Sequence, residues 1–595
     1  MRVVATAGHV DHGKSTLIRH LTGTDPDRLA EERLRGLTID LGFAATMLPS
    51  GTEVAFVDVP GHARFIKNML AGVGAVDAAM FVVAANEGWK PQSEEHLRIL
   101  QLLGIGHGLV VVTKAALVDE ETFELAELEI AEAVSGTFLD GAEMVAVDVH
   151  AGIGVAGEEG PGEGRGGLVD ALERLIVATP AAPDRGRPRL YIDRSFALPG
   201  AGTVVTGTLT GGGLQLNERL VVEPGGLKVR VRGLHSHGRP LNEASPGRRL
   251  AVSLSGVSHH SLRRGQALVA EGQWHPSRTI DASLEVLSSI ARGLGRRGAF
   301  VGYFGSGEYP VRLSVLGSAG EVGPGETGFV RLSLPVPLPL LPGDRYVLRE
   351  SGRAETVGGG EILDVAPVLP VSRARPSISP ERVVTERGFV QVDELERLTG
   401  VRLKATLGDL VVDPAALASA ADGLGEKVRN AGAAGLDPAV LDGRERMIAA
   451  RSTDVAFVDG RLFRADHLAD VVASGVGDSH PYVALLMASP FSPPLPDSLD
   501  RGELRALGRR ELAVDCDGLW FATEAVAQAS RIVASLLARS PGGVTASQVR
   551  EALGTTRRYV LPLLSHMDST GVTRRRGDLR IAGPRLPDAV GNLSG

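Results

Sequence analysis

The sequence predicts a multidomain chain in which an α/β domain comes first, two β-barrels follow, and winged-helix modules end the chain. Its 595 residues are too many for one hydrophobic core, and about 150 residues per domain suggests roughly four domains. Strands and helices alternate in the first third, short strands with Gly/Pro turns fill the middle, and short helices with Gly-centred turns come last. These patterns are typical of the three architectures.

The α/β domain is predicted from buried strands separated by helices. Apolar stretches such as RVVATA, EVAFVDV and GLVVVTK are bounded by turn residues, whereas KSTLIRHLTG and SEEHLRILQLLG have helical spacing. This alternation predicts a parallel sheet with helices on both faces. A Gly/Glu-rich segment at 151–167 is expected to form a flexible surface loop. The predicted boundaries are 1–178 for the α/β domain, 189–273 and 276–368 for the two barrels, 380–479 for winged-helix modules 1 and 2, and 480–595 for modules 3 and 4.

The composition is that of a soluble globular protein without disulfides. Hydrophobic residues make up 43% and charged residues 23% of the chain, which is ordinary for such proteins. No apolar run is long enough to span a membrane, and the N-terminus leads directly into a strand, so we expect no signal peptide and no membrane partner. The single cysteine, Cys516, cannot form an internal disulfide and is expected to be a structural thiol in a reducing cytoplasm.

The charge of the chain is distributed unevenly. The formal net charge is -8, yet residues 541–595 carry eight arginines against four acidic residues and are therefore at net +4. Lysine is rare, with seven among the 63 basic residues, and two of these, Lys14 and Lys114, fall in motifs of a nucleotide site. A compact ammonium group suits a phosphate-binding loop.

The stretch GHVDHGKST at 8–16 has the pattern G-x-x-x-x-G-K-[ST] between a predicted strand and a predicted helix. Backbone N–H groups of such a loop cradle phosphates, Lys14 is expected to reach the β- and γ-phosphates, and Ser15 is expected to bind Mg²⁺. The alternative is an ordinary glycine turn at a strand end. The predicted nucleotide-binding residues are Asp11, His12, Gly13, Lys14, Ser15, Thr16, Gly61, Thr113 and Lys114.

Two further stretches complete this pattern. In FVDVPGH, Asp58 is expected to hold Mg²⁺ through water, the Gly61 N–H to sense the γ-phosphate, and His62 to lie where a water attacks. In RLRGLTIDLGF, Thr38 is the candidate switch residue that binds Mg²⁺ only in the triphosphate state. The predicted metal ligands are thus Ser15, Thr38 and Asp58, and the predicted catalytic residue is His62.

Together, GHVDHGKST, RGLTID and DVPGH resemble elongation factor Tu and its relatives. The resemblance implies a translational GTPase that binds GTP or GDP with Mg²⁺ and in which Val10 and Leu37 form an apolar gate beside His62. One motif departs from the family pattern [NT]-K-x-D, because TKAALVD has Ala116 where the aspartate belongs. A methyl group cannot accept hydrogen bonds from guanine, so weak base selectivity is predicted unless another group such as Asp119 reads the base. The S-A motif of the family is also absent, with Asp148 and Val149 at the corresponding position.

The middle of the chain resembles the bacterial selenocysteine-specific elongation factors of the SelB type. YIDRSFALPGAGTVVTGTL, VRVRGLHSHGRP and PGRRLAVSLSGV carry this resemblance together with TIDLGF and NEGWKPQSEEHL. The resemblance implies that the first barrel holds the aminoacyl end of selenocysteinyl-tRNA and that Asp193, Arg194 and Arg249 form its pocket. A selenol is an anion at neutral pH, so arginine donors favour it over serine. The alternatives are a surface salt bridge between Asp193 and an arginine, and Arg248 in place of Arg249.

The basic tail resembles the last winged helix of the same family. ASQVREALGTTRRYVLPLLSHMD predicts a helix–turn–helix, and GVTRRRGDLRI predicts a two-stranded wing with Gly577 and Asp578 at its tip. Arginines on a wing suit an RNA backbone and a splayed base, and the alternative is a solvated charged face. The family implies that the partner is an mRNA hairpin, the SECIS element. The predicted hairpin-binding residues are Arg557, Arg558, Arg574, Arg575, Arg576 and Arg580.

The resulting prediction is a cytoplasmic, monomeric GTPase that delivers selenocysteinyl-tRNA to the ribosome at a recoded UGA codon marked by an mRNA hairpin. One alternative is a general tRNA carrier or initiation-type GTPase, which has no need of an RNA-binding winged helix. Another is a non-hydrolysing RNA-binding protein with a decayed nucleotide site. Ala116 favours this second alternative, whereas the intact Lys14, Thr38 and His62 argue against it.

Overall fold

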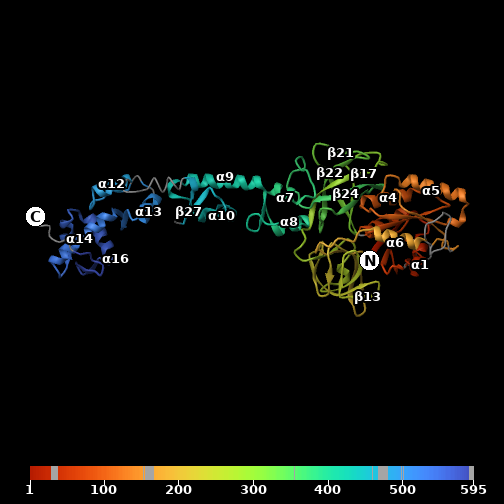
Figure 1. Cartoon of the computed structure of the whole chain (residues 1–595), viewed down its shortest axis with the longest axis horizontal. Helices are drawn as coiled ribbons and strands as arrows, with labels where there is room; N and C mark the ends of the chain where they lie inside the picture. The colour runs from red at the N-terminus through yellow and green to blue at the C-terminus, as the bar shows by residue number, and fades with distance from the viewer. Residues whose placement is uncertain are drawn as a thin grey trace. The chain divides into compact units, whose positions relative to one another are not determined.

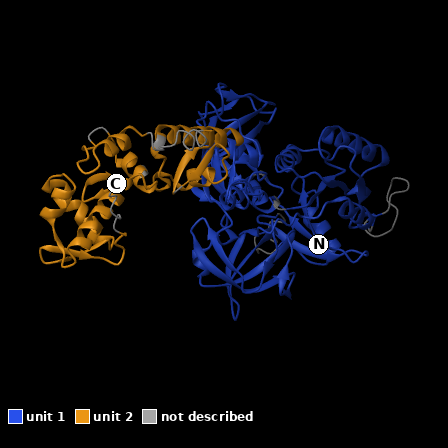
Figure 2. Cartoon of the chain, turned by 60° about the vertical axis from the view of Figure 1, so that its left-hand side comes forward, with its two compact units in different colours: residues 1–413 blue, residues 414–595 orange. Residues whose placement is uncertain are grey.

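The computed structural model contains two compact units, Met1–Asp413 and Pro414–Gly595, which are coloured separately in Figure 2. The structure describes the chain except for residues 28–31, 33–37, 75, 152, 155–166, 354, 459, 467–479, 497–498, 500 and 589–595. Three predictions fall wholly or largely on these residues and lie outside the described part. They concern Leu37 of the apolar gate, the loop at 151–167, and the helical stretch LADVVASGV at 468–476.

The first unit begins with a six-stranded sheet of order β2-β3-β1-β4-β5-β6. Its strands are parallel except β2, which runs antiparallel to β3 at the edge. Buried residues on both faces pack against the helices, which accounts for the near-continuous apolar strands. The elements, seen in red and orange in Figure 1, are β1 (Arg2–Ala7), α1 (Lys14–Thr22), β2 (Gly42–Met47), β3 (Glu53–Asp58), α3 (Ile66–Val73), β4 (Ala78–Ala84), α4 (Pro91–Leu102), β5 (Gly108–Thr113), α5 (Glu120–Val134), β6 (Met144–Val147) and α6 (Leu168–Ala178).

Six strands close the first barrel in the order β11-β16-β7-β9-β15-β12, because β12 pairs back to β11. Its interior is a cluster of alternating aliphatic residues, as a small barrel requires. Strand β8 (Arg194–Leu198) pairs with β9, and β13 (Arg239–Leu241) pairs with β12. The barrel strands are β7 (Arg189–Tyr191), β9 (Gly202–Thr210), β11 (Arg219–Glu223), β12 (Leu227–Ser236), β15 (Arg248–Ser255) and β16 (Ala267–Ala270).

The second barrel is also closed, in the order β17-β22-β20-β19-β23-β24. It contacts both of its neighbours within the unit: Arg349 forms an ion pair with Glu95 of α4 at 3.3 Å, and Asp344 forms one with Arg189 of the first barrel at 2.6 Å. The strands are β17 (Ser277–Val286), β19 (Phe300–Phe304), β20 (Gly307–Val315), β22 (Thr327–Leu338), β23 (Arg345–Glu350) and β24 (Glu355–Asp364).

A small helical module completes the first unit. Helices α7 (Pro380–Arg387) and α8 (Val392–Thr399) lie with the hairpin of β25 (Phe389–Gln391) and β26 (Leu410–Val412). Their buried residues join the core cluster of the second barrel. The division between the two compact units thus falls within the range predicted for winged-helix modules 1 and 2.

Within its described residues, the second unit contains two β-hairpins and one three-stranded sheet, each beside helices. Its last module has the three-stranded sheet β31-β33-β32 and a helix–turn–helix. The wing turns at Gly577, which adopts a positive φ of 65°. Its elements are α9 (Pro414–Asn430), α10 (Gly443–Ala449), β27 (Val455–Val458), β28 (Arg461–Arg464), α12 (Pro481–Ala488), α13 (Arg501–Arg509), β29 (Ala513–Cys516), β30 (Leu519–Ala522), α14 (Thr523–Arg539), β31 (Val544–Thr545), α15 (Ala546–Ala552), α16 (Arg557–Ser569), β32 (Thr573–Arg576) and β33 (Leu579–Ala582).

The predicted fold class is confirmed. An α/β domain, two β-barrels and winged-helix modules occur in the predicted order. The lone cysteine lies in β29 with only 1% of its surface exposed, and burial raises the pKa of its thiol to about 12. Cys516 is therefore an inert core residue. Among the described residues, no helix is both long and apolar enough to cross a membrane.

Candidate functional site: a phosphate loop, an arginine pocket and an arginine wing

The phosphate loop joins the end of β1 to the start of α1. Gly8 has a φ of 127°, and a Cβ at this position would lie 2.1 Å from the carbonyl oxygen of Val82, so only glycine fits. The buried His96 holds the same turn, since its Nδ1 accepts the Gly8 N–H at 3.1 Å. Burial lowers the pKa of His96 to about 3, which keeps the ring neutral and able to accept. Sequence reasoning did not identify His96, because it lies far along the chain in α4.

Lys14 lies inside this loop and is 5% exposed. Its ammonium donates to the Gly8 carbonyl at 3.0 Å and also to the His9 carbonyl. Burial lowers the pKa of Lys14 to about 8, and the nearby Asp58 opposes this shift. A buried ammonium held by two carbonyls is ready to exchange them for phosphate oxygens.

The three predicted metal ligands come together at the start of α1. The Ser15 hydroxyl donates to Oδ2 of Asp58 at 2.7 Å and lies 2.8 Å from the Thr38 hydroxyl. The Thr6 hydroxyl donates to the other oxygen of Asp58 at 2.7 Å. The pKa of Asp58 is raised by burial. Hydroxyl and carboxylate oxygens are the hard donors that Mg²⁺ prefers, so this group of residues fits that ion.

The structure adds Asp27 to this group. Its carboxylate accepts a hydrogen bond from the Thr38 hydroxyl at 2.9 Å. The carboxylate is half-buried, and burial raises its pKa. Asp27 lies in a loop without a motif, so no sequence signal distinguishes it from other surface aspartates.

Gly61 and His62 follow β3 beside the phosphate loop. A Cβ on Gly61 would lie 2.5 Å from the Lys14 ammonium and 2.6 Å from the Val10 nitrogen, so the close approach requires glycine. His62 is partly exposed, and its Nδ1 accepts the Arg64 N–H at 3.2 Å. That bond leaves Nε2 as the nitrogen that can face a water.

The base-reading end of the site is formed by the carboxyl end of β5. The Thr113 hydroxyl donates to the His12 carbonyl at 2.7 Å and ties β5 to the phosphate loop. The Lys114 ammonium pairs with Glu87 at 2.9 Å, which fixes its side chain. Asp119 is exposed and caps α5 by accepting the Thr122 N–H at 2.9 Å. It is therefore engaged as a helix cap, and the structure does not support it as the missing base reader.

The three predicted pocket residues lie together on the first barrel. Arg249 forms a bidentate pair with Asp193 at 2.7 and 3.0 Å, and its guanidinium lies 3.4 Å from the centre of the Phe43 ring. Arg194 donates to the Leu41 carbonyl. The alternative ion pair of Asp193 with an arginine is thus present, and Arg249 rather than Arg248 makes it. Arg194 and Arg249 both contact the stretch that follows Thr38, at Leu41 and Phe43 respectively.

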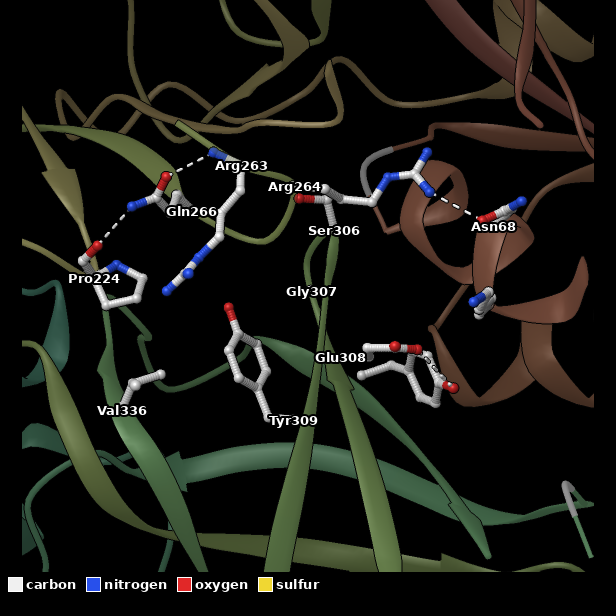
Figure 3. A pocket seen from close by; sticks show the side chains of 12 residues that line it. Asn68, Pro224, Arg263, Arg264, Gln266, Ser306, Gly307, Glu308, Tyr309 and Val336 are labelled. Carbon is white, nitrogen blue, oxygen red and sulfur yellow. Dashed lines mark hydrogen bonds between the residues drawn. The ribbon is translucent and has the colours of Figure 1, made fainter. Parts of the chain in front are cut away.

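A polar cavity of about 450 Å³ lies where the α/β domain and the two barrels meet. Arg263, Arg264 and Lys67 make its lining basic. Figure 3 shows Arg263 and Tyr309 pointing toward one another across it, while Arg264 donates to Asn68 at 2.9 Å. Sequence reasoning missed this cavity, because its residues come from three domains and share no motif.

The arginines of the last module divide into exposed and buried members. Arg574, Arg575 and Arg576 of β32 are exposed, as are Arg557 and Arg558 at the start of α16. Arg580 differs from the prediction: it is 7% exposed and forms an ion pair with Asp568 at 3.4 Å. Arg580 lies in β33, the central strand of its sheet, and its ion pair stabilises the wing. It is therefore not one of the exposed arginines that can contact RNA.

Comparisons with known proteins agree with this architecture. Residues 1–181 match the family model of the elongation factor Tu GTP binding domain, and residues 535–582 match the model of the elongation factor SelB winged helix. The selenocysteine-specific elongation factor of Desulfomicrobium baculatum is 41% identical over 364 residues, which cover 61% of this chain and 55% of that protein. Elongation factor Tu 2 of Streptomyces avermitilis is 33% identical over 389 residues, which cover 61% of this chain and 96% of that protein.

A solved structure extends the similarity over nearly the whole chain. The crystal structure of a bacterial selenocysteine-specific elongation factor, EF-Sec, superposes with a TM-score of 0.66 at 25% identity and covers 98% of this chain and 99% of that chain. By contrast, the matches to curated selenocysteine-specific relatives span about half of those proteins' length, 55% and 56% for two of them.

The phosphate loop, the oxygen ligands beside it and the two barrels define the class of translational GTPases. The chain belongs to the elongation factor Tu family, and its last module is similar to the winged helix of elongation factor SelB. Members of this family bind guanine nucleotide and hydrolyse GTP.

Proposed function

We propose that the protein binds GTP with Mg²⁺, carries selenocysteinyl-tRNA and delivers it to the ribosome at a UGA codon marked by an mRNA hairpin. The observation that carries this proposal is the joint presence of a complete phosphate and metal site with an arginine wing in one chain. Ser15 lies within hydrogen-bonding distance of both Thr38 and Asp58, and three consecutive exposed arginines lie in β32.

In the proposed nucleotide site the metal ion neutralises phosphate charge, and the chain's residues hold the reactants. Lys14 exchanges its carbonyl partners for phosphate oxygens, and the close approach of Gly61 to Lys14 lets its N–H sense the terminal phosphate. His62, held by the Arg64 N–H, orients the attacking water. Thr38 leaves the metal-binding residues Ser15 and Asp58 when the terminal phosphate is lost. Its departure changes the conformation of the segment that follows it.

The proposed aminoacyl site lies on the first barrel at Asp193, Arg194 and Arg249. A selenolate there gains charge-assisted hydrogen bonds from the guanidiniums, whereas serine offers no charge. Both arginines contact the stretch Asp40–Phe43 just after Thr38. A change in the position of Thr38 between the GTP and GDP states can therefore move the few residues that join it to the contacts of Arg194 and Arg249. The basic cavity at Lys67, Arg263 and Arg264 supports a contact to a tRNA phosphate.

The proposed hairpin-binding surface consists of Arg557, Arg558, Arg574, Arg575 and Arg576. All five are exposed, and they lie on the wing and on the first turn of α16. The rest of the chain is acidic, which discourages nonspecific binding of RNA elsewhere. An RNA-binding protein with a decayed nucleotide site is the second candidate, favoured by Ala116, and the ordered phosphate and metal residues argue against it.

Ribosome-stimulated GTP hydrolysis tests the GTPase part of the proposal. His62→Ala should leave GTP affinity unchanged, because His62 touches only the water, and should lower the stimulated rate by about 10²-fold or more. His20→Ala, at an exposed position of α1, is the matched control and should behave like the parent. Equal stimulated rates for His62→Ala and the parent would show that another group orients the water.

A further inference from the structure

Two adjacent parallel strands bring Lys114 and Asp148 to the same edge of the sheet. In the register of β5 and β6, Thr113 lies opposite Val147. The next residues along the chain, Lys114 and Asp148, therefore leave the sheet side by side, about 4.8 Å being the usual spacing of neighbouring strands. Lys114 belongs to the base-reading motif, so Asp148 lies beside the place where a nucleotide base is read.

The carboxylate of Asp148 is held in a defined position. Its Oδ1 accepts the backbone N–H groups of His150 at 3.0 Å and Ala151 at 2.9 Å, and its Oδ2 accepts the Ala116 N–H at 3.3 Å. Two backbone hydrogen bonds between Asp148 and Ile153, at 3.1 and 3.0 Å, close the loop beneath it. The residue is 6% exposed. The side chain is thus oriented against residue 116, the position that lacks an acid.

The acid lies at residue 148 and not at residue 116, and these two residues are in contact. The 113–116 motif has a methyl group where the family pattern requires a carboxylate, and residue 148 has a carboxylate where that pattern has a small serine. Asp119, the other acid near the motif, caps α5 and is turned to solvent. Asp148 is therefore the acid whose geometry places it at the base end of the site.

We propose that Asp148 supplies the carboxylate that reads guanine in place of the missing motif aspartate. A carboxylate oxygen can accept two hydrogen bonds, and within the described part of the chain Oδ2 accepts only from Ala116. Oδ2 can therefore accept one further hydrogen bond, and the guanine 2-amino group is a donor that suits it. This inference rests on the proposed GTP-dependent function and deepens it by naming the residue that sets base specificity.

Equilibrium nucleotide binding by the full-length chain with Mg²⁺ tests the inference. In Asp148→Asn, the amide oxygen can still accept the N–H groups of His150 and Ala151, but the amide nitrogen takes the place of Oδ2 and donates where the guanine 2-amino group also donates. Xanthine has a carbonyl oxygen at that position. Asp148→Asn should therefore weaken GDP and GTP by about 10–10²-fold, since one hydrogen bond to a charged group is worth about one to two factors of ten. It should strengthen XDP and XTP by a comparable factor.

Asp119→Asn is the matched control, since it changes an acid three residues from Ala116 without touching the proposed contact. It should keep the parent's preference for GTP over XTP. A gain of xanthine binding also shows that Asp148→Asn is folded. Unchanged GTP and XTP affinities in Asp148→Asn would overturn the inference and leave the GTPase proposal standing, whereas a parent that binds ATP as well as GTP would overturn the proposed function itself.

The reciprocal exchange gives an independent test. Asp148→Ser should lose most of its GDP affinity, and Ala116→Asp together with Asp148→Ser should recover it, because the carboxylate returns to the motif. Ala116→Asp alone should weaken binding, since two carboxylates would crowd one site. Failure of the double variant to bind more tightly than Asp148→Ser would contradict the exchange.

Discussion

Reversing the charge of the wing tests whether the last module binds RNA through its arginines. The perturbation is the joint change of Arg574, Arg575 and Arg576 to Glu, three exposed residues on β32. Each arginine–phosphate contact releases a counterion and contributes about 0.9 to the slope of log affinity against log salt. Treating the hairpin stem as a duplex, the five exposed arginines of the module predict a slope of about -4.5. A fourfold rise in salt should then weaken binding about 500-fold.

Losing three of these contacts should lower the slope to about -1.8 and weaken binding about 500-fold at 0.1 M salt, before any repulsion by the new glutamates. The assay is a salt titration of full-length protein against structured RNA hairpins, followed by fluorescence anisotropy. The control variant changes Arg505, Arg531 and Arg539 of the same unit to Glu, since all three are exposed and none belongs to β32 or to α16. Equal losses in both variants, or a slope near zero for the parent, would refute a specific arginine contact.

Two other predictions concern the pocket and the phosphate loop. Arg249→Gln combined with Asp193→Asn, which avoids leaving a buried charge unpaired, should reduce the preference for selenocysteinyl- over seryl-tRNA by about tenfold or more; Arg248→Gln, whose guanidinium lies 3.9 Å from Glu53, should retain the full preference. Burial lowers the pKa of His96 to about 3. Between about pH 3 and pH 6.5 the unfolded chain therefore binds a proton at this residue that the folded chain does not bind. The free energy of unfolding of the apo-protein should increase as the pH rises through this window, by at most about 1.4 kcal/mol per pH unit for this residue. His96→Gln should flatten that rise in thermal melts, whereas the exposed His20→Gln should not.

The motifs that contact phosphate could be predicted from the sequence because they are continuous. Residues Gly8 to Ser15 form a phosphate loop between a strand and a helix. The glycines, the lysine and the serine that this loop requires are consecutive in the sequence or a few residues apart. The approach of Thr38 to Ser15 was also predicted, on the resemblance of its motif. The contact of Asp27 with Thr38 was not, because a loop aspartate has no spacing that marks its partner.

The features that could not be predicted depend on strand pairing and burial between residues far apart in the sequence. Arg580 belongs to a basic run in the sequence, but β33 pairs on both sides, and its side chain faces Asp568. Strand β2 is not among the strands that the sequence predicts, and it adds an antiparallel edge along β3 to the predicted parallel sheet. Asp148 was noted only as a departure from a family motif. Its meaning depends on the pairing of β5 with β6, which no local pattern specifies.

Nucleotide-dependent protection of the aminoacyl ester tests the central claim most directly. Selenocysteinyl-tRNA and seryl-tRNA are incubated with the full-length protein and either GTP or GDP, and the rate of ester hydrolysis is measured. The proposed function predicts strong protection of selenocysteinyl-tRNA with GTP, little with GDP, and little protection of seryl-tRNA with either nucleotide. Equal protection of both aminoacyl-tRNAs, or protection of selenocysteinyl-tRNA that does not depend on the nucleotide, would contradict it.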